Sequence, residues 1–124
     1  MLERRTGMES SLRVIEMVRK GNISGHISSL SVPILWFLTE KTLPESEAKE
    51  VTKSIIKGFS IITLNPEILN KSFKSEIGDF EDAIQLYSAI KGNCKYLITR
   101  NKKDFITAGK ISILTPEEFL SLGN

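Results

Sequence analysis

Oxygen-bearing side chains that could bind a metal ion gather in two short segments of this chain. The first segment holds Asp79, Glu81 and Asp82, and the second holds Asn101 and Asp104. Mg²⁺ prefers oxygen ligands and is usually held by one or two carboxylates and several waters. The two segments therefore offer a hard-metal site. Each also has a structural interpretation, the first as the N-cap and first turn of a helix and the second as a solvated turn.

Cations lie next to the second acidic segment. Arg100, Lys102 and Lys103 alternate with its oxygen donors, and side chains of this type hold a phosphate backbone. Ser28 could donate a further hydrogen bond to a phosphate. These residues are the candidates for contact with a nucleic acid.

The elements that must position these residues alternate between helix and strand. Apolar spacing, caps and glycines predict helices over residues 8–20, 32–41, 43–58, 66–74, 79–91 and from 115 onward. β-branched and apolar runs predict strands over residues 25–29, 59–64, 96–99 and 111–114, and residues 100–107 are expected to form a loop with one helical turn. This alternation indicates a parallel sheet covered by helices, whose functional edge lies at the carboxyl ends of the strands. The helix over residues 32–41 is so apolar that we expect it to be buried.

The composition excludes several classes of protein. The chain has 124 residues, 40% of them hydrophobic, and a net charge of +2, which is too balanced to imply a nucleic-acid partner by itself. Its longest apolar run, residues 32–38, is far below the roughly 20 residues that span a bilayer. The single Cys94 excludes an internal disulfide framework and a cysteine-rich zinc site. With no secretion signal at the N-terminus, we expect a cytoplasmic protein.

Three motifs together resemble the PIN-domain family. They are DFEDA at residues 79–83, YLITRNKKDF at 96–105 and ILTPEEFL at 113–120, and the last is similar to the end of small bacterial members. The resemblance implies a single three-layer α/β/α domain over residues 1–124 with a short parallel sheet. It also implies Mg²⁺- or Mn²⁺-dependent cleavage of RNA, and many small members are VapC-like toxins that pair with an antitoxin.

The resemblance assigns roles to individual residues. Asp82 matches the acid at the start of the fourth core helix, Asn101 matches a position that is Asp or Asn, and Asp104 matches the last acid. These three are the catalytic and metal-binding candidates, and Asp79 and Glu81 are supporting metal ligands.

The sequence departs from the family pattern in two places. The first strand, which lies at the centre of the family's sheet and carries an Asp, has no counterpart, so we expect an N-terminally incomplete domain with a weakened sheet. Ile34 stands where the family usually has a Glu in the following helix. Because isoleucine cannot bind a metal, two of the four usual acids are absent and Mg²⁺ binding should be weak.

Two main hypotheses follow from these features. The chain is either a metal-dependent ribonuclease, of the kind that acts as the toxin of a toxin–antitoxin pair, or a degenerate PIN fold that serves as a non-catalytic binding or dimerisation module. An unrelated response-regulator-like domain is a third and weaker interpretation. The apolar residues 32–38 make a homodimer plausible.

Overall fold

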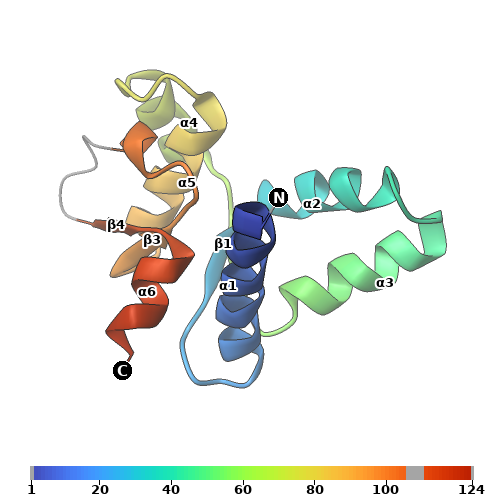
Figure 1. The fold of residues 1–124 in the computed structure, drawn as a ribbon. Coiled ribbons are helices and arrows are strands. Elements are labelled where there is room, and N and C mark those ends of the chain that lie inside the picture. Colours follow the sequence, from blue (N-terminus) through green and yellow to red (C-terminus); the bar gives the residue numbers. More distant parts are fainter. Residues whose placement is uncertain (1, 106–110, 124) are drawn as a thin grey trace.

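Helices and short strands alternate along the chain, as Figure 1 shows. The computed structural model describes residues 2–105 and 111–123, with side chains from Glu9 onward. The helices are α1 (Leu2–Arg19), α2 (Ser31–Glu40), α3 (Glu45–Ile56), α4 (Pro66–Phe73), α5 (Phe80–Lys91) and α6 (Pro116–Leu122). The strands are β1 (His26–Ser28), β2 (Ser60–Ile62), β3 (Tyr96–Ile98) and β4 (Ser112–Leu114), and a 3₁₀ turn covers Lys102–Phe105.

The elements form the three-layer α/β/α arrangement that the alternation predicted. Helix α5 packs against α4 and against β1, β2 and β3, while α1 packs against α6, which also contacts β4. Within the described ranges, no helix is both long and apolar enough to cross a membrane.

The strands form two separate parallel pairs. Ile27 of β1 lies opposite Ile61 of β2, and Leu97 of β3 lies opposite Ile113 of β4. Among the described residues no strand joins the two pairs. The sheet is therefore split, in agreement with the expectation that its central strand is missing.

Local capping signals place two helices, α4 and α6, where the sequence predicted them. The Asn65 side chain accepts a hydrogen bond from the Ile68 amide at 2.8 Å and begins α4. Thr115 begins α6 with a capping box, in which the side chains of Thr115 and Glu118 each accept from the other's amide. Caps of this kind depend only on residues three apart, so they can be recognised in a sequence.

A small core lies between α5 and the second strand pair. Its members are apolar side chains with little or no exposed surface: Ile77, Ala83, Leu86, Ala89, Phe105 and Ile111. Phe105 comes directly after Asp104, so its burial anchors the 3₁₀ turn that carries this acid. Of the loop expected over residues 100–107, the last two lie outside the described residues.

Two expectations about helices were wrong. Helix α2 has no buried residue, and Phe37 and Leu38 are 65% and 57% exposed. The main contact of α2 is α3, with which it forms a hairpin that projects from the body of the molecule (Figure 1). Helix α1 begins at Leu2 rather than at Met8, because helical hydrogen bonding continues upstream of its apolar stripe.

Candidate acidic site at the start of α5

Asp79 caps α5, as its structural interpretation predicted. Its Oδ1 accepts a hydrogen bond from the Asp82 amide at 3.0 Å, and its backbone is extended. One carboxylate oxygen of Asp79 therefore has a structural partner. The side chains of Glu81 and Asp82 follow in the first turn, where negative charge interacts favourably with the helix dipole.

Asp82 is the electrostatic centre of the acidic residues. Its side chain is half-buried, and burial is the largest cause that raises the pKa of the Asp82 carboxyl. The charges of Asp79, Asp104 and Glu81 raise this pKa further, in that order. The fold thus brings the two acidic segments close enough for their carboxylates to repel each other. A bound cation would relieve this repulsion.

Asn101 and Asp104 lie on the loop that follows β3, and both are exposed. The Asn101 amide donates to Thr99 Oγ1 at 3.1 Å, and the Asp104 amide donates to the Asn101 carbonyl at 3.0 Å. These bonds fix the backbone of the loop at the carboxyl end of β3. They use backbone atoms of Asn101 and Asp104 and none of their side-chain atoms.

The donor set fits a hard divalent cation only in part. Carboxylate oxygens from two elements approach Asp82, and Mg²⁺ is often held by one or two carboxylates with water and a substrate phosphate. However, among the described residues no three or more His, Cys, Asp or Glu side chains are arranged to hold a metal ion. The structure therefore contains no preformed cage and, at most, a site of few protein ligands.

A cavity of about 410 Å³ opens beside these acids. Asp82 and Glu81 line it together with Ile34 and Leu38 of α2. Ile34 thus presents a hydrocarbon side chain to the same cavity as the Asp82 carboxyl.

Gln85 is a site residue that the sequence analysis missed. It lines the same cavity, and its Nε2 donates to Ser31 Oγ at 2.9 Å, which joins α5 to the start of α2. The available signal was its spacing, because residues three apart on a helix share a face and Gln85 follows Asp82 by three positions.

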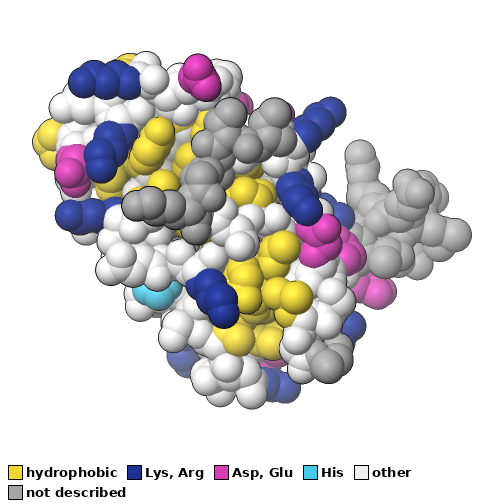
Figure 2. Space-filling model, turned by 90° about the vertical axis from the view of Figure 1, so that its left-hand side faces the viewer, with side chains coloured by type: hydrophobic (Ala, Val, Ile, Leu, Met, Phe, Trp, Pro, Cys, Tyr) yellow, Lys and Arg dark blue, Asp and Glu magenta, His cyan; other side chains and the backbone are white. Residues whose placement is uncertain are grey.

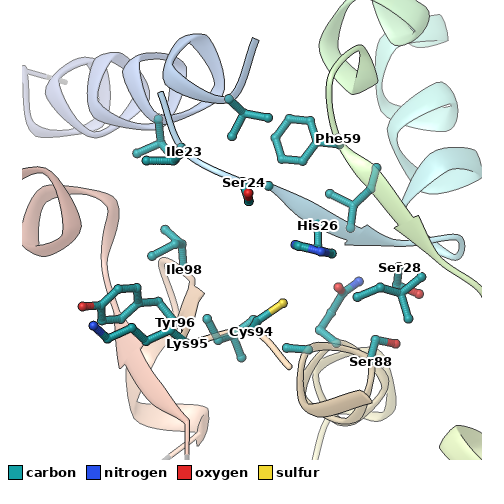
Figure 3. Close-up of a pocket in the computed structure, with 18 of the residues that line it drawn as sticks. Ile23, Ser24, His26, Ser28, Phe59, Ser88, Cys94, Lys95, Tyr96 and Ile98 are labelled. Atoms are coloured by element: carbon teal, nitrogen blue, oxygen red, sulfur yellow. The ribbon is translucent and has the colours of Figure 1, made fainter. Parts of the chain in front are cut away.

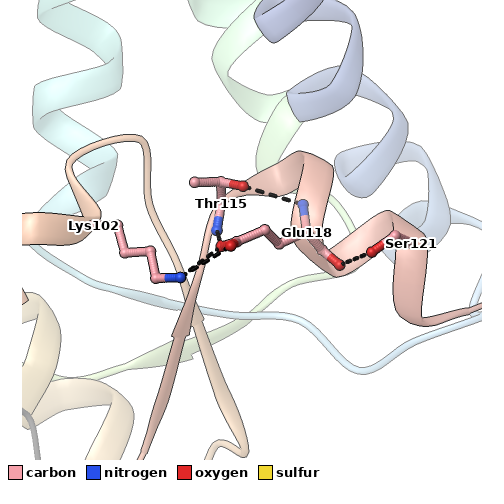
Figure 4. A network of polar contacts seen from close by, with 4 residues as sticks. All are labelled: Lys102, Thr115, Glu118 and Ser121. Atoms are coloured by element: carbon pink, nitrogen blue, oxygen red, sulfur yellow. Dashed lines mark hydrogen bonds and ion pairs between the residues drawn. The ribbon is translucent and has the colours of Figure 1, made fainter.

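Two of the three cations expected to contact RNA, Arg100 and Lys102, are engaged with acids. Lys102 Nζ lies 3.0 Å from both carboxylate oxygens of Glu118, and Figure 4 shows this pair beside the Thr115 cap. Hydrogen bonds from the Thr115 amide and from Lys102 lower the pKa of Glu118. Arg100 lies 3.6 Å from Glu117 and also donates to Ser11.

Basic side chains do not form one continuous patch on the face shown in Figure 2. Lysine and arginine side chains are scattered there among hydrophobic ones, and the acids occupy separate positions. The net charge of the whole chain is only +2, so the chain offers little long-range attraction for a polyanion.

Ser28 is part of the fold rather than of an open rim. It is only 1% exposed, and its Oγ accepts a hydrogen bond from the Leu30 amide at 3.2 Å. Its neighbour Ser29 accepts from the Leu64 amide at 3.0 Å and so joins the ends of β1 and β2. Because both hydroxyls have internal partners, we do not assign Ser28 to the contact with RNA.

Comparison with protein families agrees with the fold. A PIN-domain family model matches residues 1–103, a range that includes Asp79, Glu81, Asp82 and Asn101 and ends just before Asp104. No curated protein matches the chain. Since the match spans most of the 124 residues and the fold is the expected α/β/α sandwich, the chain belongs to the PIN-domain family, which generally includes nucleases.

Proposed function

We propose that this chain is a divalent-metal-dependent ribonuclease that hydrolyses RNA phosphodiester bonds. The observation that supports the proposal is the environment of Asp82, whose carboxyl has a raised pKa among three further acids at the start of α5. PIN domains typically depend on divalent metals, and a cluster of mutually repelling carboxylates is what such a cation stabilises.

Asp82 and Asp104 are the proposed protein ligands of Mg²⁺ or Mn²⁺, with the Asn101 carbonyl as a third oxygen donor. When bound, the cation would lower the pKa of a water and neutralise charge on the scissile phosphate. Asp79 and Glu81 contribute negative charge around the site, although Asp79 is also committed to the helix cap.

Lys103 is the proposed first contact with the RNA backbone. Arg100 and Lys102 would join it only by exchanging Glu117 and Glu118 for phosphates. Both ion pairs are exposed, so the exchange costs little.

An RNA-cleavage assay tests the proposal. The wild-type chain is incubated with labelled RNA and Mn²⁺ or Mg²⁺, with EDTA as the metal-free control. Asp82→Asn should lose activity, whereas Glu47→Gln, which removes one exposed carboxylate on α3, should retain it. Cleavage that persists in EDTA or in Asp82→Asn would contradict the proposed mechanism.

A second candidate function is a non-catalytic PIN fold that binds a partner. Two observations favour it: Ile34 stands where an acid was expected and lines the same cavity as Asp82, and no described set of three ligands is arranged for a metal. Metal-dependent RNA binding without cleavage, or no RNA binding at all, would favour this module over the enzyme.

The proposed biological setting is that of a cytoplasmic toxin with an antitoxin protein. Phe37 and Leu38 on the projecting α2 offer an exposed apolar surface for such a protein or for a second copy of the chain. Sedimentation of the purified chain, followed by sedimentation of any complex it forms, tests both assemblies. A strict monomer at high concentration would exclude the homodimer.

A further inference from the structure

Two phenylalanine rings lie exposed where α4 ends and α5 begins (Figure 1). Phe73 is the last residue of α4 and is 72% exposed, and Phe80 is the first residue of α5 and is 41% exposed. Their ring centroids are 4.8 Å apart and their planes meet at 27°, so the two rings are stacked on each other. The pair therefore presents an aromatic surface to solvent.

The segment that joins the two rings is fixed by hydrogen bonds and by the core. Ser75 Oγ accepts a hydrogen bond from the Ile77 amide at 3.0 Å, and the Ile77 side chain is buried in the core beside α5. Asp79 caps α5 directly before Phe80. A fixed backbone thus positions both rings, which lowers the entropy cost of binding a ligand to them.

Polar and charged side chains surround the two rings along the chain. Over residues 70–82, Phe73 and Phe80 are the only exposed apolar side chains, and the other exposed side chains are Asn70, Lys71, Lys74, Glu76, Asp79 and Glu81. An amphipathic helix of a partner protein needs a longer apolar groove, whereas a base needs only the face of an aromatic ring. The small size of this apolar patch therefore favours a flat ligand.

The aromatic pair lies next to the acids that are proposed to hold the cation. Phe80 precedes Asp82 by two residues in the first turn of α5, which corresponds to about 3 Å along the helix axis. If a phosphate is bound through a cation at Asp82, the base of an adjacent nucleotide is within reach of the Phe80 ring.

Lysines near the pair add attraction for a phosphate backbone. Lys74 follows Phe73 directly, is exposed, and forms no ion pair within the described part of the chain. Lys71 pairs with Glu67 at 3.8 Å, but both side chains are more than half exposed, so a phosphate can replace Glu67 at little cost. The acids of α5 oppose this attraction, so the rings must supply most of the local affinity.

The larger cavity of the molecule lies elsewhere, between the two strand pairs. It has a volume of about 540 Å³ and is lined by β1 and β3, and in Figure 3 the side chains of His26 and Cys94 face each other across it. Neither Phe73 nor Phe80 lines this cavity. Access to the two rings therefore does not depend on what fills it.

We propose that the Phe73–Phe80 pair binds an unpaired nucleobase by stacking, which deepens the ribonuclease function proposed above and rests on it for the choice of RNA as the ligand. A base can stack on a side chain only when it is free of its own partners, so the substrate is single-stranded next to the scissile phosphate. Stacking accepts every base and favours purines, whose larger ring system covers more of the aromatic face. The pair is thus a subsite for one nucleotide beside the acids.

The test measures binding of two RNA heptamers, one of uridine with a central adenosine and one of uridine alone. Each carries a fluorophore, and anisotropy is read in EDTA so that no metal-dependent cleavage consumes the RNA. Phe73→Leu and Phe80→Leu keep an apolar side chain without an aromatic face, and each should weaken binding of the adenosine heptamer by roughly tenfold. The wild-type chain should bind the uridine heptamer roughly threefold more weakly, because pyrimidines stack less well.

Two further variants serve as controls. Phe73→Tyr keeps the ring and should keep the affinity. Phe37→Leu removes a ring of similar exposure on α2 and should also bind as wild type. Urea unfolding confirms that each variant is folded, which is expected because the substituted side chains are largely exposed.

Nuclear magnetic resonance separates stacking from general contact. In a chain with labelled phenylalanine, the ring protons of Phe73 and Phe80 should move upfield when the adenosine heptamer is added, because protons above the face of a base are shielded. Those of Phe37 should stay in place. An RNA duplex of twelve base pairs should move neither ring of the pair, since its bases are already paired and stacked.

Three results would overturn the proposal. The first is unchanged affinity of Phe73→Leu and Phe80→Leu, the second is equal binding of the duplex, and the third is no binding of either heptamer. If the leucine variants instead alter sedimentation of the chain and leave RNA binding unchanged, the rings form a protein contact and the proposal is wrong.

Failure of the ribonuclease function gives a different result. If the chain cleaves RNA with Mn²⁺ and both leucine variants bind RNA as wild type does, the enzyme stands and the stacking subsite does not. If the leucine variants lose affinity and no divalent metal supports cleavage, the rings bind RNA in a chain that is not a nuclease.

Discussion

Ile34 of α2 and Asp82 of α5 line the same cavity, although they belong to different helices. An apolar side chain therefore shares this cavity with a carboxyl whose pKa is raised by burial and by neighbouring acids. Isoleucine offers no metal ligand to this cavity, and among the described residues no three possible ligands are arranged to hold a metal ion. Position 34 is therefore where a single substitution should have the largest effect on metal affinity.

Ile34→Glu should tighten the binding of Mn²⁺ by roughly tenfold, which corresponds to about 1.4 kcal/mol. The new carboxylate adds an oxygen ligand and a negative charge to the cavity that Asp82 lines. Isothermal titration calorimetry measures the affinity, and Ile34→Gln, which has the same length without the charge, is the control. Equal affinities of the Glu and Gln variants would show that position 34 does not contact the metal.

Asp82 should make the folded chain less stable as the pH rises. Because its pKa is higher in the fold than the ordinary value of 3.8, the native state holds this proton more tightly than the unfolded state. The associated stability is present below pH 3.8 and is lost as the pH rises through the raised value.

Asp82→Asn should therefore raise the free energy of unfolding at pH 7 relative to wild type, and the difference should shrink as the pH falls toward 3.8. Urea unfolding in metal-free buffer across this range measures it. Glu47→Gln is the control for loss of a charge that is remote from the cluster. A difference that stays constant with pH would mean that Asp82 does not titrate differently in the fold.

Elements of this fold that depend on near neighbours could be predicted from the sequence. Asp79, Asn65 and Thr115 cap helices through bonds that span three residues, and a sequence shows such spacing directly. The approach of Asp104 to Asp82 was also expected, because the start of the helix over residues 79–91 was expected close to the carboxyl ends of the strands, where the loop with Asp104 begins.

Features that depend on packing between distant elements could not be predicted in this way. An apolar run such as Phe37–Leu38 indicates burial, but it does not reveal that α2 packs mainly against α3 and projects from the body. The ion pair between Lys102 and Glu118 was equally hidden, because it joins the loop after β3 to α6. Such pairs depend on how elements meet, which composition and periodicity do not fix.

Ser88→Ala should stabilise the chain by about 1–2 kcal/mol, because it removes a buried hydroxyl that has no partner. Part of any gain comes from the higher helix propensity of alanine, which is worth about 0.5 kcal/mol. Ser54→Ala on α3 changes an exposed helical serine and measures that part alone. Urea unfolding of both variants gives the difference. A gain no larger than that of Ser54→Ala would mean that Ser88 finds a partner in solution.

Thr115→Ala should destabilise the chain by about 1 kcal/mol, because it removes the N-cap of α6. Lys102→Met should cost less than about 0.5 kcal/mol, since its ion pair with Glu118 is exposed at both ends. Chemical denaturation ranks the two variants. If the lysine variant lost more stability than the threonine variant, the loop after β3 would depend on the ion pair rather than on the cap.

Truncation to alanine should cost far more stability at Phe105 than at Phe37. Phe105 is 2% exposed in the core, so Phe105→Ala should cost about 3–5 kcal/mol through lost burial and a cavity. Phe37 is 65% exposed on α2, so Phe37→Ala should change the free energy of unfolding by no more than about 0.5 kcal/mol. Urea unfolding at low protein concentration measures both. A large loss for Phe37→Ala that appears only at high concentration would show that a second copy covers α2, whereas a large loss at every concentration would show that α2 packs within the chain.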